Sequence, residues 1–183
     1  MRFLECFSYD FNSNNPHISG IFKKYIRYKN NFRYSMYVNL RLTEYFWSKY
    51  KVSKFYIFKF IADYFRNKNV RDNSFEHGYY HNIQKNVTFH HTDITIPNGT
   101  TILEGSHLYK GITLAKYDGK IPFIGRNNVI FSHSIIVGSK LNDNVVVGAG
   151  SVVVDDMAKN SLVVGSPGQR IKEIKDSYKY IDK

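Results

Sequence analysis

The chain is poor in the residues that cross-link a fold or carry it through a membrane. Among 183 residues it has one cysteine, four prolines and one tryptophan. A lone Cys6 excludes an intrachain disulfide and a cysteine-type metal site. No stretch approaches the roughly 20 consecutive apolar residues of a membrane span, and the N-terminus lacks the apolar core of a signal peptide. We therefore expect a cytoplasmic protein with no metal.

Acidic residues are also scarce, with 15 Asp and Glu against 26 Lys and Arg and a net charge of +11. The excess is uneven, because residues 1–75 hold 14 basic and 5 acidic residues. The same segment holds 21 of the 30 aromatic residues. Such a surface suits polyanions: nucleic acid, coenzyme phosphates, anionic glycans or an anionic membrane. No nucleic-acid motif accompanies the charge, and we expect no nucleic-acid partner.

Residues 1–75 are predicted to form a helical module. After an irregular segment at 1–20, apolar residues recur at three- and four-residue spacing, as in Met36 and Leu40, and then from Phe55 to Phe65. This spacing predicts two or three amphipathic helices between residues 21 and 67, followed by a polar connector at 67–73. The module is expected to cap the rest of the fold. A second interpretation is peripheral contact with the inner face of the membrane.

A six-residue repeat follows the module. Aliphatic residues occupy every sixth position, with one interruption: Ile96, Ile102, Leu108, Leu114, Leu141, Val147 and Val153. A period of six fits neither a helix nor a lone strand. It is typical of a parallel β-helix in which each flat face of a coil contributes one stacked side chain. The fold class predicted is therefore mainly β, a hexapeptide β-helix at residues 76–172, with a C-terminal tail at 173–183.

The repeat has three irregular places. Residues 115–120 interrupt it and predict an extruded loop, and the 17 residues between Ile124 and Leu141 predict a shortened turn at 136–140. After the repeat we expect a last strand at 162–164, a turn at 165–167, and a short helix or tail at 171–180.

Two blocks of the repeat resemble a known family. They are Lys110-Gly111-Ile112-Thr113-Leu114 with Pro122-Phe123-Ile124-Gly125, and Gly148-Ala149-Gly150-Ser151-Val152-Val153 with the segment from Asn160 to Pro167. Together they resemble hexapeptide-repeat acyltransferases of the serine acetyltransferase branch, which includes capsule and O-antigen O-acetyltransferases. Over residues 75–172 the resemblance implies a left-handed parallel β-helix, a homotrimer, and acetyl-CoA in a groove between coils.

The resemblance also implies a catalytic histidine just before the regular repeat. His90 lies six residues before Ile96 and matches that position, and His91 is the alternative if the alignment slips by one residue. A base near neutral pKa can take the proton of a hydroxyl as it attacks a thioester, and a backbone N–H can stabilise the oxyanion. The nearest acids are Glu76 before and Asp93 after, and Glu76 is the candidate for orienting the imidazole. A purely structural histidine is the other interpretation.

For acetyl-CoA, small residues at coil corners allow close approach of the pantetheine arm. The expected coenzyme contacts are Ser132, Ser134, Ala149 and Gly150, with Lys159 and Arg170 as candidate phosphate partners. His133 stands where the family has small residues and is expected to alter the groove. His77, His81 and His107 are expected to be structural or solvent-facing.

The acceptor is expected to be a sugar hydroxyl. The second histidine that serine acetyltransferases carry before the Pro-x-Ile-Gly block is replaced by Ile121. We therefore expect transfer of acetyl to a surface polysaccharide or to its nucleotide- or lipid-linked precursor. A serine O-acetyltransferase is the alternative enzyme. A non-catalytic scaffold or glycan-binding β-helix is the alternative of another class.

Overall fold

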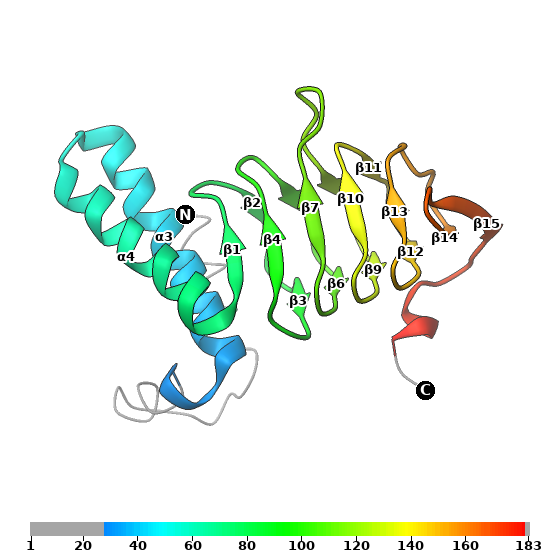
Figure 1. The fold of residues 1–183 in the computed structure, drawn as a ribbon, viewed down its shortest axis with the longest axis horizontal. Coiled ribbons are helices and arrows are strands. Elements are labelled where there is room, and N and C mark those ends of the chain that lie inside the picture. The colour runs from blue at the N-terminus through cyan, green and yellow to red at the C-terminus, as the bar shows by residue number, and fades with distance from the viewer. Residues whose placement is uncertain (1–27, 182–183) are drawn as a thin grey trace.

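The structure is a computed structural model that describes residues 28–181. Two long helices, α3 (Phe32–Ser53) and α4 (Tyr56–Asn73), form a hairpin at one end of a β-structure (Figure 1). The helical module is confirmed for these residues, whereas the prediction of an irregular segment at 1–20 lies outside the described part. The connector predicted at 67–73 is wrong, because α4 continues through it. Neither described helix is long and apolar enough to cross a membrane.

Short strands make up most of the remaining chain. Their bounds are β1 (Phe75–His77), β2 (Asn82–Ile83), β3 (Thr88–Phe89), β4 (Ile94–Ile96), β5 (Thr101–Ile102), β6 (His107–Leu108), β7 (Thr113–Ala115), β8 (Phe123–Ile124), β9 (Val129–Ile130), β10 (Ile135–Val137), β11 (Lys140–Leu141), β12 (Val145–Val147), β13 (Val152–Val153), β14 (Ser161–Val164) and β15 (Gln169–Glu173). A 3₁₀ helix, η1 (Tyr178–Tyr180), follows.

The strands pair into three sheets that form the faces of a solenoid. Face 1 has the order β1-β4-β7-β10-β13, face 2 has β2-β5-β8-β11, and face 3 has β3-β6-β9-β12-β14-β15. All pairs are parallel except β14 with β15. Every third strand returns to the same face, as a coil requires. The predicted fold class is confirmed: a mainly β parallel solenoid with N-terminal helices.

The six-residue repeat forms three aliphatic columns inside the solenoid. Strand register stacks the residues of face 1 (Ile96, Leu114, Ile136, Val153), face 2 (Ile83, Ile102, Ile124, Leu141) and face 3 (Phe89, Leu108, Ile130, Val147, Val163). All these side chains are at most 2% exposed. Burying one such side chain contributes about 1.5–3 kcal/mol, so the columns are the main source of cohesion.

The irregular places are largely as predicted. Tyr117 and Lys120 exchange backbone hydrogen bonds across the extruded loop. Only two residues separate β10 from β11, which confirms the shortened turn. The short helix or tail expected at 171–180 is wrong at its start, because residues 169–173 form β15, antiparallel to β14. Only the last three residues, in η1, are helical.

The first coil has no preceding coil to pair with, and the helices take that role. The Tyr37 hydroxyl donates to the Val87 carbonyl and accepts from the Phe89 N–H, which lies 3.0 Å away. Arg41 donates to the Ile83 carbonyl at 2.9 Å, and Arg66 of α4 donates to the His77 carbonyl at 2.9 Å. Buried backbone groups need such partners, so the helices satisfy the open end of the coil.

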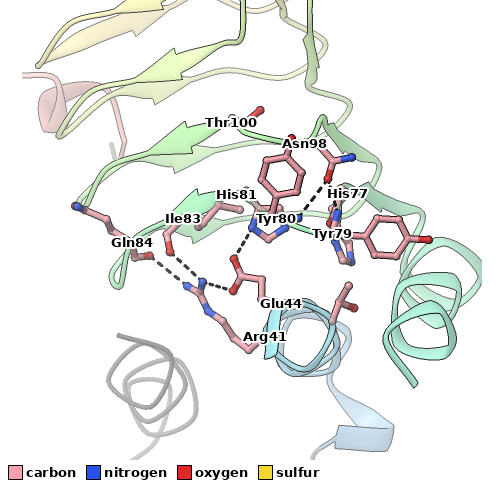
Figure 2. Close-up of polar contacts among 12 residues, drawn as sticks. Arg41, Glu44, His77, Tyr79, Tyr80, His81, Ile83, Gln84, Asn98 and Thr100 are labelled. Atoms are coloured by element: carbon pink, nitrogen blue, oxygen red, sulfur yellow. Dashed lines mark hydrogen bonds and ion pairs between the residues drawn. The ribbon is translucent and has the colours of Figure 1, made fainter. Parts of the chain in front are cut away.

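Buried polar side chains complete this junction (Figure 2). Glu44 lies 3.0 Å from Arg41 and 2.5 Å from His81, whose side chain is fully buried. Burial alone would raise the pKa of Glu44, but His81 and Arg41 outweigh it and hold that pKa below its usual value. The Glu44–His81 contact therefore joins α3 to the corner before β2, whereas the Arg41–Glu44 ion pair lies within α3. Of the two expectations for His77 and His81, the structural one is confirmed.

His77 occupies the first position of the face 1 column, opposite Ile96. Its Nδ1 lies 2.8 Å from the Gly78 carbonyl and its Nε2 lies 3.1 Å from the Asn69 side-chain nitrogen. The carbonyl requires a donor at Nδ1, so Nε2 accepts the Asn69 N–H and the ring is neutral. Burial, assisted by His81, lowers the pKa of His77 to about 3 although the Gly78 hydrogen bond opposes the shift.

Acid should therefore weaken the fold through His77. In the unfolded chain, His77 binds a proton below its ordinary pKa of about 6.5. In the folded chain, the buried ring stays neutral down to about pH 3. The free energy of unfolding should fall on going from pH 7 to pH 5, with a limiting slope of about 1.4 kcal/mol per pH unit from this group. Urea unfolding of the wild type and His77→Gln measures the difference in slope. Equal slopes would contradict a neutral buried His77.

Candidate functional site

The candidate site lies along the edge where the chain turns from face 3 to face 1. We call it the histidine edge. Continuing the strand register past β3, β6, β9 and β12 aligns two rows of residues across neighbouring coils. The inner row is His90, Tyr109, Phe131 and Gly148, and the outer row is His91, Lys110, Ser132 and Ala149.

Aromatic stacking fixes the inner row. The His90 ring lies 4.2 Å from the Tyr109 ring at an interplanar angle of 9°, and Tyr109 lies 5.1 Å from Phe131. His90 Nε2 also lies 2.9 Å from His107 Nδ1, so one imidazole donates and the other accepts. The His107 ring in turn meets Tyr178 of η1 edge-on at 5.6 Å. His90 is therefore a half-buried ring held from two sides.

His107 is the contact that sequence reasoning missed. It was expected to be structural or solvent-facing, yet it touches the leading catalytic candidate. A usable signal existed, because His107 follows His90 by 17 residues, close to the length of one coil, and therefore lies diagonally beside it, two residues from the directly opposite Tyr109. Residues separated by one coil lie side by side.

The outer row is open to solvent. His91 is exposed, and the register places Lys110, Ser132 and Ala149 beside it on successive coils. Within residues 28–181, the backbone N–H groups of Lys110, Ser132 and Ala149 donate no hydrogen bond. A row of free N–H donors next to an accessible imidazole can bind amide carbonyls or a developing oxyanion.

The predicted coenzyme contacts fall into two groups, those on the surface of the histidine edge and one that is buried behind it. Ser132, Ala149 and Gly150 lie on it, with Gly150 at φ +68°. Ser134 is fully buried, and its hydroxyl contacts the carbonyls of Phe131 and Gly148 at 2.8 and 3.0 Å. Its side chain therefore supports the corner from inside. His133 has φ +61° and an exposed ring, on the coil before Gly150.

The two candidate phosphate partners, Lys159 and Arg170, lie outside the two rows of the histidine edge. Lys159 follows Met157, which pairs with Leu141 on face 2, so Lys159 belongs to a different edge. Arg170 lies on β15 opposite Val163, with its guanidinium 3.6 Å from Glu173.

Glu76 is exposed on β1, opposite Thr95 on β4. Its strand is the first of face 1 and begins the coil whose closing corner carries the two histidines. Among the described residues no contact joins its carboxylate to His90 or His91, so its role stays a prediction.

Serine acetyltransferases are among the known proteins to which this chain is similar. No protein-family model matches the chain. A segment of 89 residues is 37% identical to the serine acetyltransferase of Staphylococcus aureus strain Mu50, covering 46% of this chain. The match spans only 42% of the length of that curated relative.

Two solved structures are similar over most of the chain. A serine acetyltransferase in complex with CoA superposes with a TM-score of 0.73, at 18% identity, over 92% of this chain and 69% of that one. Soybean serine acetyltransferase complexed with serine gives 0.75, at 18% identity, over 93% and 70%. These likenesses establish a shared fold, helices included. The capsule and O-antigen part of the resemblance stays a prediction.

Replacing Tyr109 tests whether stacking holds the inner row. Tyr109→Ala removes the ring that lies between His90 and Phe131. The Tyr109 ring also packs on a second apolar cluster that contains Val129 and Val146. Because the ring is only half-buried, we expect a loss of about 2–3 kcal/mol in unfolding free energy, measured by urea denaturation. The matched Tyr109→Phe variant keeps the ring and should lose less than about 1 kcal/mol. Equal losses would assign the effect to the hydroxyl.

Proposed function

We propose that the chain is an acetyl-CoA-dependent O-acetyltransferase whose chemistry takes place at the histidine edge. The observation that carries the proposal is the exposed His91 beside a row of free backbone N–H groups. The relatives and structural neighbours named above are serine acetyltransferases, and one of those structures holds CoA. The match covers part of the relative's length, so the activity is inferred from the site together with the likeness.

His91 is the better placed of the two histidines to act as base. A general base must reach the hydroxyl proton that it removes. His91 is exposed, whereas the Nε2 of His90 faces His107 and its ring lies against Tyr109. We assign proton transfer to His91 and positioning to His90. This reverses the order in which the sequence ranked them, and His90 is kept as the alternative.

The reaction follows from this arrangement. The His91 imidazole accepts the hydroxyl proton while the acceptor oxygen bonds to the thioester carbonyl carbon. The resulting oxyanion accepts hydrogen bonds from backbone N–H groups of the outer row. As the carbon–sulfur bond breaks, the imidazolium returns the proton to the leaving sulfur, giving an O-acetyl ester and free CoA. The pantetheine arm would lie along Ser132, Ala149 and Gly150, whose small size leaves the backbone accessible.

For the acceptor we propose L-serine. The matched relative is named a serine acetyltransferase, and the soybean structure is complexed with serine. These names favour serine over the sugar acceptor that the sequence led us to expect. One residue of this chain still supports the sugar: the 38% exposed Ile121 stands where the branch has its second histidine. A glycan hydroxyl is therefore the second candidate. A homotrimer, as the resemblance implies, is part of the proposal.

Substitution of the histidines separates base from positioning residue. His91→Ala should lower kcat by about 10²–10⁴ with little change in unfolding free energy, because the side chain is exposed. His90→Ala should act mainly through stability and lower kcat less. Thiol release from acetyl-CoA, measured beside urea unfolding, gives both quantities. A larger kcat loss in His90→Ala, with a folded protein, would restore His90 as the base.

Comparing the rates of thiol release with the two classes of acceptor identifies the acceptor. With acetyl-CoA and the full chain, L-serine should support thiol release, and sugars and oligosaccharides should give rates at background level. A chain that turns over sugars but not L-serine would replace the main proposal by the second candidate. No thiol release with either class, together with no thermal shift on adding acetyl-CoA, would favour a non-catalytic solenoid.

A further inference from the structure

The tip of the helical hairpin carries an unusual set of exposed apolar side chains. They gather where α3 ends and α4 begins, and the most exposed are Val52 at 87% and Tyr56 at 75%. The full set is Val52, Phe55, Tyr56, Ile57, Phe60 and Tyr64. Phe55 belongs to the apolar spacing that predicted these helices, yet it is 68% exposed. We call this set the hairpin tip.

Helix geometry places the α4 members of the hairpin tip on one side of that helix. On α4, Tyr56, Phe60 and Tyr64 repeat at four-residue spacing, and Ile57 lies beside them on the same side. Farther along that side stand the polar Asn67 and Arg71. Along that side the exposed apolar residues therefore stop at Tyr64, midway along α4. Figure 1 shows the connection between α3 and α4 at the end that points away from the solenoid.

Basic residues flank the hairpin tip without acidic partners. Lys49, Lys51 and Lys54 form no ion pair within the described part of the chain. The acids of α4 are already engaged, since Asp63 pairs with Lys59 at 2.9 Å and Asp72 with Lys68 at 2.7 Å. The tip is therefore both apolar and positively charged.

We propose that the hairpin tip docks onto an anionic phospholipid membrane surface. Aromatic and aliphatic side chains enter the region between headgroups and acyl chains, while flanking lysines attract anionic lipid. A second copy of this chain is disfavoured as occupant, because two such tips would bring like charges together. Nucleic acid is disfavoured because the apolar side chains project from a protruding end. Docking there leaves the histidine edge, which belongs to the solenoid, open.

The test is co-sedimentation of the full chain with vesicles. We expect binding to phosphatidylcholine vesicles that contain phosphatidylglycerol, weak binding to phosphatidylcholine alone, and release by high salt. The double variant Ile57→Ser with Phe60→Ser should lower the partition coefficient at least about tenfold. Lys51→Gln should lower it about fivefold, as one lysine near an anionic surface warrants.

A matched control comes from the opposite end of the molecule. Ile171 on β15 is 58% exposed, as Ile57 is 59% exposed, so Ile171→Ser should leave vesicle binding unchanged. Sedimentation velocity of each free protein reports its assembly. The proposal is overturned if anionic vesicles do not bind the chain, or if the tip variant binds as well as the wild type. It is also overturned if the tip variant changes the assembly state of the free protein, which would mean that another copy covers the tip.

Discussion

The solenoid and the candidate site both depend on the pairing of each coil with its neighbour. A coil has few residues per face, so it can bury its single inward side chain only against the coils before and after it. The first coil has no predecessor, and its free backbone groups and apolar interior must be covered by something else. The α3 helix does this with Tyr37 and Arg41, which bond directly to the backbone of β2 and β3. The helices and the solenoid are therefore one structure, despite their different compositions.

The same pairing builds the candidate site. Because parallel coils stack in fixed register, any residue at a given corner lies beside its equivalents on the next coils. The outer row needs nothing more than this to place His91 in line with Lys110, Ser132 and Ala149. The inner row adds rigidity, since His90 stacks on Tyr109 and contacts His107. In the proposed function, these two adjacent histidines therefore have different roles, because one is held by stacking and the other is exposed.

Much of this could be read from the sequence, and the limits have physical causes. The six-residue repeat predicted the three columns because inward positions recur strictly, and the breaks in it predicted the 115–120 loop and the short turn before β11. The polar run at 67–73 was misread as a connector. Its Asn69 and Asn73 are buried in a hydrogen-bond network, which a hydrophobic pattern cannot reveal. Likewise, Glu44 and His81 meet only because the helix folds over the first coil, and they are 37 residues apart in the sequence.

A structure of the full chain with CoA tests the central claim most directly. If the histidine edge is the reaction site, the coenzyme's pantetheine arm should run along Ser132, Ala149 and Gly150, and its thiol should lie closer to His91 than to any other histidine. A thiol placed beside His90 would keep the edge and exchange the two histidines' roles. Coenzyme bound at another edge of the solenoid, such as the one that carries Lys159, would contradict the account.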